Sequence, residues 1–118
     1  MRLAFAICSY CLLSGVAYAE SDANQFLRSF DAGTLAERHR MSENLSQIET
    51  GMSWINVFIA EDRKERPIYC PPNTLAPTGG QLVDVLRTEV RRVPEEGSRP
   101  LGLVLMLALQ KAFPCEPK

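Results

Sequence analysis

The residues best suited to chemistry in this 118-residue chain are four cysteines and one histidine. Cys8 and Cys11 have the C-x-x-C spacing of a redox motif, whereas Cys70, Cys115 and His39 stand far apart. A structural zinc site needs four such ligands in one place. A catalytic serine or cysteine needs a base to activate it, and His39 is the only imidazole in the sequence.

Neither His39 nor the carboxylates have the context of a catalytic site. His39 lies between Glu37 and Arg40 in a polar stretch, which is typical of a solvated surface histidine. Asp84 and Glu89 are five positions apart on a predicted helix, a spacing that does not align two side chains. We therefore expect a protein that is not an enzyme, with no catalytic residue, no metal and no cofactor.

The first 19 residues have the pattern of a secretory leader. Arg2 gives a positive start, residues 3–13 are almost entirely apolar, and Ala17-Tyr18-Ala19 is a small-x-small cleavage site. The apolar run is too short for a membrane anchor, the alternative, which needs about 20 residues. We predict a signal peptide over residues 1–19 that is cleaved after Ala19, a periplasmic location, and one domain over residues 20–118.

Export determines how the cysteines are used. Cys8 and Cys11 leave with the leader, and an oxidising compartment favours a disulfide between Cys70 and Cys115. The whole chain has a formal net charge of −1, which becomes −2 once Arg2 is removed. No basic stripe interleaves with aromatic residues, so neither nucleic-acid binding nor attraction to an anionic membrane is expected.

Helical periodicity fills the first half of the chain, which contains no proline before Pro67. Ser21 or Asp22 can cap a short helix that ends at the stop signal in residues 31–34, and residues 35–40 fit either a helical turn or a connector. The apolar side of this first helix is formed by Ala23, Phe26, Leu27 and Phe30.

The clearest predicted helix covers residues 41–59, where apolar residues are spaced alternately four and three apart. We interpret this stripe as core, formed by Met41, Leu45, Ile48, Met52, Ile55 and Ile59 and widened by Trp54 and Phe58. Gly51 costs a helix about 1 kcal/mol relative to alanine. It indicates either a close helix crossing or a tolerated weak point. Residues 61–66 are a run of mixed charge at the end of this helix.

The second half is punctuated by proline and glycine. Residues 67–80 cannot be regular, and Thr78 with Gln81 forms a capping box that opens a third helix. Gly79-Gly80 indicates a turn rather than an anion site. The inward residues of the third helix are predicted to be Leu82, Val83, Leu86, Val90 and Val93.

Pro100 fits the first position of a fourth helix. Its predicted buried face consists of Leu101, Val104, Leu105, Ala108, Leu109 and Ala112. Other apolar residues surround this helix, so it is either central or faces a partner, and a homodimer through it is compatible with the pattern. With no alternating strand pattern, the predicted class is all-α, a small compact domain of about four helices with one disulfide.

Four segments of the second half carry a family resemblance: Tyr69-Cys70-Pro71-Pro72, then Gln81-Leu82-Val83-Asp84-Val85-Leu86, then Arg99-Pro100-Leu101 with Leu105, and Ala108-Leu109-Gln110-Lys111-Ala112-Phe113-Pro114-Cys115. Their order and spacing resemble the Rap/Tai family of periplasmic immunity proteins from type VI secretion systems. Many members carry a further cysteine pair, and Phe30 and Glu49 stand in those places here, with Gly51 matching a family glycine. The chain is similar to a divergent member.

The resemblance implies a small helical protein that inserts a surface into the active-site cleft of a secreted peptidoglycan amidase. The partner-facing residues are expected in the loop that the disulfide would anchor, namely Asn73, Thr74, Leu75, Ala76, Pro77 and Thr78, or else in the charged turn of residues 61–66. The alternatives from other classes are a periplasmic helical stress chaperone and a subunit of an envelope complex.

Overall fold

The protein forms four α-helices in a computed structural model that describes residues 21–72 and 76–117. They are α1 (Ala23–Ala32), α2 (Leu35–Glu61), α3 (Gly79–Arg92) and α4 (Leu101–Ala112), and the 3-10 helix η1 (Pro94–Ser98) joins the last two. The described residues contain no strand, only an isolated bridge between Asp22 and Pro100. The predicted all-α class is confirmed.

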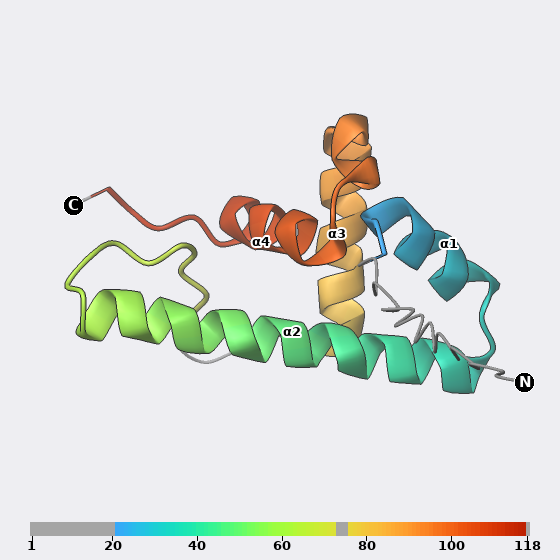
Figure 1. Ribbon diagram of the computed structural model, residues 1–118, viewed down its shortest axis with the longest axis horizontal. Helices are drawn as coiled ribbons and strands as arrows, with labels where there is room; N and C mark the ends of the chain where they lie inside the picture. Colours follow the sequence, from blue (N-terminus) through green and yellow to red (C-terminus); the bar gives the residue numbers. More distant parts are fainter. Residues whose placement is uncertain (1–20, 73–75, 118) are drawn as a thin grey trace, which may run out of the picture.

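Helix α3 is the centre of the arrangement. Figure 1 shows the long helix α2 lying along one side with α4 beside it, while α3 crosses both and α1 packs next to α3. The core is buried between them and consists of Ala23, Phe26, Leu27, Leu45, Tyr69, Leu82, Val83, Leu86, Leu101, Val104, Leu105 and Leu109.

Side-chain caps set the helix boundaries. Asp22 begins α1, where its Oδ1 accepts a hydrogen bond of 2.7 Å from the amide of Gln25. Thr34 and Glu37 form a capping box, so the undecided residues 35–40 are the first turns of α2. The predicted box of Thr78 and Gln81 is confirmed at α3. Pro100 is the N-cap of α4, one position earlier than expected, because Leu101 is the first helical residue.

Part of the apolar stripe that was predicted to be core lies on the exposed side of α2. Trp54, Ile55 and Phe58 are exposed at 70%, 53% and 52%, so they are not core. The reason is that α3 meets α2 near Ser42, well before these residues. Farther along, Glu49 and Asn56 on the inner side of α2 hydrogen-bond to the chain after Pro67.

The close helix crossing is made by Gly79 and not by Gly51. A Cβ on Gly79 would lie 2.6 Å from the carbonyl oxygen of Ser42, so the start of α3 rests on the backbone of α2. A Cβ on Gly51 would have nothing within 4 Å, which leaves the tolerance interpretation for that glycine.

Helix α4 packs against α3, and its buried side differs from the predicted one at a single residue. Its inward residues are buried as expected except Ala112, which is exposed because the chain leaves the helix there. The start of α1 is joined to the start of α4, since the amide of Leu101 donates to the oxygen of Ser21 at 3.0 Å and that of Ala23 to the oxygen of Arg99 at 3.2 Å. None of the helices in the described part of the chain is both long and apolar enough to cross a membrane.

Candidate binding site

The chain between Arg66 and Cys70 is held against the residues that follow α4. A disulfide joins Cys70 to Cys115, with the two Cα atoms 4.9 Å apart. The amide of Cys70 also donates to the oxygen of Phe113 at 2.8 Å, and the guanidinium of Arg66 donates to the oxygen of Cys115. This segment, residues 66–70, is named the anchored segment below. The predicted pairing of the two cysteines is present.

A buried asparagine attaches the anchored segment to α2. Asn56 donates its side-chain amide to the oxygen of Tyr69 at 2.7 Å and accepts from the amide of Ile68 at 2.7 Å. Both groups of the Asn56 side chain are therefore used, as burial of a polar group requires. The pair of bonds fixes the distance between α2 and the anchored segment.

A second polar contact fixes the side chain of Tyr69. Its hydroxyl donates to Glu49 Oε1 at 2.9 Å, and both residues are buried. Burial, and then the hydrogen bond to the Glu49 carboxylate, raise the pKa of the Tyr69 hydroxyl above its usual range. Tyr69 therefore stays protonated and remains a donor to Glu49.

Only part of the predicted contact loop lies in the described chain. Asn73, Thr74 and Leu75 are outside the described residues, while Ala76 is exposed. Pro77 lines an apolar cavity of about 240 Å³ together with Pro72, Gln81, Val85 and Phe113. Thr78 is engaged as the cap of α3, because its hydroxyl accepts from the amide of Gln81 at 3.3 Å. The anchored segment thus leads directly into this loop.

The charged turn after α2 is partly occupied by its own contacts. Arg63 lies 3.5 Å from Glu65, an exposed pair worth little in stability. Arg66 is bound to the chain end, and Lys64 adopts a φ of 57°. Of the two predicted surfaces, the turn is the one whose side chains the structure describes in full.

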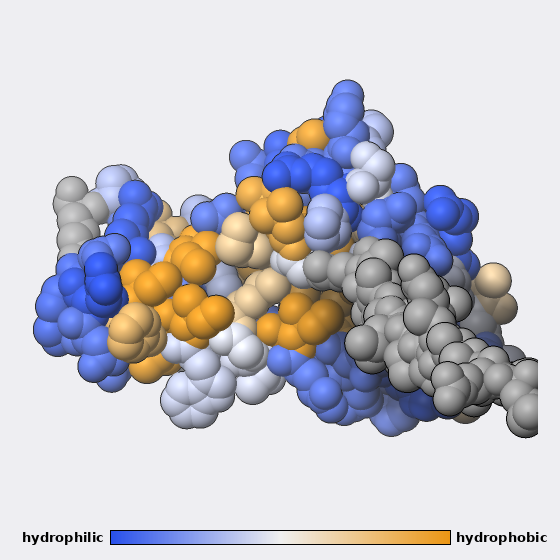
Figure 2. Space-filling model, in the orientation of Figure 1, coloured by the Kyte–Doolittle hydropathy of each residue, from blue (hydrophilic) through white to orange (hydrophobic). Residues whose placement is uncertain are grey.

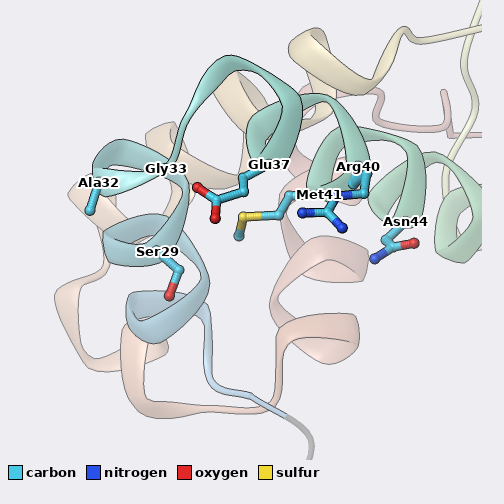
Figure 3. A pocket seen from close by; sticks show the side chains of 7 residues that line it. All are labelled: Ser29, Ala32, Gly33, Glu37, Arg40, Met41 and Asn44. Atoms are coloured by element: carbon cyan, nitrogen blue, oxygen red, sulfur yellow. The ribbon is translucent and has the colours of Figure 1, made fainter.

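A hollow of about 450 Å³ lies in the corner between α1 and α2. Figure 3 shows the side chains of Glu37, Arg40 and Met41 pointing toward it. Glu37 is not free for chemistry there, because Oε2 accepts the amide hydrogen of Thr34 at 2.7 Å. That hydrogen bond lowers the pKa of Glu37.

The described residues contain no arrangement of metal ligands. Within residues 21–72 and 76–117, no three His, Cys, Asp or Glu side chains lie together in a way that could hold a metal ion. His39 is exposed on α2. Glu89 is buried and accepts two hydrogen bonds from Arg92, at 2.5 and 3.1 Å. Its carboxylate is therefore used in holding α3 together.

A family model for Rap1a immunity proteins matches residues 6–115. The chain belongs to the Rap1a immunity protein family. No curated protein and no solved structure matched the chain. The resemblance seen in the proline-rich segment and the last helix is thus confirmed over most of the sequence. The family's description indicates a role in immunity against a toxin.

Phe30 and Glu49, the residues expected at the positions of a further family cysteine pair, make other contacts in this Rap1a family member. Phe30 stacks on Phe26 with ring centroids 6.3 Å apart, and the Arg38 guanidinium lies 5.9 Å from the centre of the Phe30 ring. Glu49 accepts the hydrogen bond from Tyr69. Both places are therefore filled by contacts rather than left empty.

The polar contacts that position the anchored segment were not predicted from the sequence. Glu49 and Asn56 are seven residues apart, on the same side of α2 as Leu45 and Met52. A polar residue that interrupts an apolar stripe at helical spacing was the available signal. It indicates a buried partner with hydrogen-bonding groups, which here is the backbone of Ile68 and Tyr69.

Proposed function

We propose that this Rap1a family member binds a secreted peptidoglycan amidase and blocks it by occluding the active site. The proposal places the protein in the periplasm after removal of residues 1–19. Family membership supports a toxin as the partner. The observation that carries the mode of binding is the anchored segment, which a disulfide and five hydrogen bonds fix just before the predicted contact loop.

Rigidity is what the anchored segment contributes to binding. Each side chain that becomes ordered on association costs about 0.5–1.5 kcal/mol of affinity. Because Ile68, Tyr69 and Cys70 are already held against α2 and the chain end, a loop that begins at Pro71 starts from a fixed point. A fixed starting point of this kind lowers the entropy cost of placing the loop in an enzyme cleft.

The contact residues in this proposal are those of the loop, Asn73 to Thr78. Thr78 is also the cap of α3, so its replacement would change the helix as well as the surface. The sharper variant therefore combines Asn73→Ala, Thr74→Ala, Leu75→Ala and Pro77→Ala and leaves Thr78 intact. A matched variant changes the charged turn instead, with Arg63→Ala, Lys64→Ala and Glu65→Ala.

The test measures protection and inhibition. If the gene beside this one encodes a secreted amidase, cells that export that amidase should survive when they also export the chain, and the purified chain should inhibit that amidase. The loop variant should lose inhibition while its melting temperature stays near that of the parent. Full inhibition by both the loop and the turn variants would refute the contact assignment. Absence of any inhibition by the parent chain would refute the proposed function.

The exposed apolar residues Trp54, Ile55 and Phe58 favour a second candidate, a periplasmic chaperone that binds unfolded proteins. Prevention of client aggregation at low pH, without any toxin, would support it. An envelope-complex subunit would instead be found in a stable assembly after extraction. Neither outcome is expected from an inhibitor of one enzyme.

Export has its own test. The chain recovered from the periplasm should lack residues 1–19 and begin at Glu20, which mass spectrometry would show directly. Replacement of Ala19 by a bulky residue such as tyrosine should leave the longer chain uncleaved. Recovery of an unprocessed parent chain would contradict the predicted signal peptide.

A further inference from the structure

The disulfide between Cys70 and Cys115 is accessible mainly from one side. Cys70 is exposed, whereas Cys115 is half-buried and its Sγ lies 3.6 Å from the carbonyl oxygen of Pro67. Thiol–disulfide exchange begins when a thiolate attacks one sulfur of a bridge, and its rate depends on access to that sulfur. Access to this bridge is therefore better at Cys70.

A hollow of about 340 Å³ lies beside Cys70, between the C-terminal half of α2 and the anchored segment. Cys70 is among the described residues that line it, and Cys115 is not. The apolar part of its wall is formed by Val57, Ala60, Pro67 and Pro71. Figure 2 shows hydrophobic side chains gathered along the part of the molecule that contains the C-terminal half of α2. The hollow gives an incoming molecule room next to the exposed cysteine.

Contacts other than the bridge hold both cysteines in place. The amide of Cys70 donates to the oxygen of Phe113 at 2.8 Å, and Asn56 binds the backbone of the two residues before Cys70. The Arg66 guanidinium donates to the oxygen of Cys115. None of these bonds involves sulfur, so they persist when the bridge is open. The two Cα atoms, 4.9 Å apart, are then still close enough for the bridge to form again.

The packing of the helices does not depend on the bridge. The buried core cluster contains neither cysteine, and α3 packs on α2 and α4 through residues of that cluster. Tyr69, the buried core residue of the anchored segment, is held by Glu49 on α2. Opening of the bridge should therefore loosen the chain around Cys70 and Cys115 and leave the four helices in place.

We propose that Cys70 is a site of thiol–disulfide exchange, at which an external dithiol reversibly opens the bridge to Cys115. A thiolate of the dithiol attacks Cys70 Sγ, a mixed disulfide forms, and Cys115 leaves as a thiolate that takes up a proton. The second thiolate of the dithiol then attacks its own partner sulfur, and Cys70 leaves in the same way. Two electrons and two protons pass to the protein while the dithiol becomes a disulfide. The assignment goes beyond the proposed inhibition and does not rest on it.

A thioredoxin variant that retains only its attacking cysteine tests which sulfur is attacked. This variant cannot complete the exchange, so the mixed disulfide with the chain recovered from the periplasm can be trapped by acid. Mass spectrometry of the linked peptides identifies the cysteine of the chain. The link should be through Cys70, and a link through Cys115 would overturn the assignment.

Alkylation compares the two thiols in the parent chain. The chain is reduced with dithiothreitol, freed of it, and treated while folded with a limiting amount of iodoacetamide. Cys70 should be labelled at least about tenfold faster than Cys115, because it is the exposed residue. In concentrated guanidinium chloride the two rates should become similar. Equal rates in the folded chain, or faster labelling of Cys115, would contradict the proposal.

Circular dichroism tests whether the bridge opens without unfolding. The reduced chain should keep the helical signal of the parent and melt at a lower temperature. Oxidised glutathione should then restore both the bridge and the parent melting temperature. Loss of the helical signal on reduction would make the bridge a requirement of the fold rather than an exchange site, and failure to form the bridge again would be equally damaging.

Variants test the contacts that hold the reduced pair together. Arg66→Ala and Asn56→Ala should each slow closure of the bridge by oxidised glutathione at least about threefold, because they lower the effective concentration of one thiol near the other. Arg66 is exposed, so its replacement should leave the helical signal unchanged. Arg63→Ala and Asn44→Ala are the matched controls. Closure at the parent rate in all four variants would refute the positioning role.

Two dithiols distinguish the source of the exchange partner. Complete thioredoxin and dithiothreitol are compared at equal thiol concentration, with opening of the bridge followed by mass. Faster opening by thioredoxin would assign the partner to a protein that uses the hollow beside Cys70, and faster opening by dithiothreitol would assign it to a small dithiol. A bridge that neither reagent opens in the folded chain would overturn the proposal.

Discussion

At the scale of single residues, Asn56 joins α2 to the backbone of the anchored segment. Its side chain makes two hydrogen bonds of 2.7 Å to the backbone of Ile68 and Tyr69, and it is buried. A buried amide that lost its partners would pay the full cost of its desolvation. Asn56 therefore contributes to the position of the anchored segment beside the disulfide and the other hydrogen bonds.

Asn56→Ala should destabilise the protein by about 1–3 kcal/mol, because it leaves the amide of Ile68 and the carbonyl of Tyr69 without these partners. Chemical denaturation of the purified chain measures the change in the free energy of unfolding. Asn44→Ala is the control, since Asn44 lies on the same helix but is exposed. Equal unfolding midpoints for the two variants would show that the Asn56 bonds contribute nothing.

The ion pair between Asp31 and Arg87 makes stability depend on pH. Arg87 donates to both carboxylate oxygens of Asp31 at 2.7 and 2.9 Å. The hydrogen bond from Arg87, opposed in part by desolvation, lowers the pKa of Asp31 below its usual 3.8. A group whose pKa is lower in the folded state contributes stability above its unfolded pKa and loses it as the pH falls through the folded value.

Asp31→Asn should therefore lower the melting temperature at neutral pH, and the gap to the parent should close as the pH falls from 3.8 to below the lowered pKa of Asp31. Thermal melts between about pH 7 and about pH 2 measure both effects. Glu95→Gln, an exposed carboxylate without an ion pair among the described residues, is the control. A gap that stays constant over this range would contradict the assignment to the carboxylate charge.

At the scale of elements, α2 shows what periodicity alone can establish. The capping residues Asp22 and Thr78 are local signals, so the starts of α1 and α3 follow from the sequence. Thr34 belongs to the predicted stop signal after α1, so the start of α2 was not predicted. The burial of Trp54 and Phe58 does not follow, because α2 carries apolar residues on two sides and the helical period is the same for each. Which side becomes core is decided by the place where α3 crosses, and that contact is between distant residues.

Two glycines give a matched test of that crossing. Gly79→Ala should destabilise the fold by about 1–3 kcal/mol, since its Cβ would lie 2.6 Å from the carbonyl oxygen of Ser42. Gly51→Ala should stabilise it by up to about 1 kcal/mol, because the site is open and alanine is the better helix former. Equilibrium unfolding measures both. Changes of the same sign would place the helix crossing elsewhere.

At the scale of the whole molecule, one disulfide closes the second half of the chain. The pairing was predictable from the two cysteines that remain after removal of the leader. The irregular loop around Cys70 was predictable from its prolines. The hydrogen bonds of Glu49 and Asn56 to the anchored segment were not predictable, because no local sequence signal shows which backbone a buried polar side chain will contact. The disulfide of the candidate site was thus predicted from the sequence, and its buried hydrogen bonds were not.

Cys70→Ser and Cys115→Ser should each lower stability by about 4 kcal/mol under oxidising conditions, as expected for a bridge between residues 45 positions apart. The double variant should lose no more than either single one, because each change removes the same bond. Thermal or chemical unfolding measures the loss. Parent and variants with equal midpoints would show that the bridge does not form in the isolated protein.

The contact between the start of α1 and the start of α4 makes the folding rate depend on distant parts of the chain. Ser21 and Ala23 hydrogen-bond to Leu101 and Arg99, which lie 80 and 76 positions farther along the sequence. Contacts of such large separation slow folding, because the entropy of loop closure is lost before the contacts form. The protein should therefore fold more slowly than a helical protein of similar size whose contacts are all local.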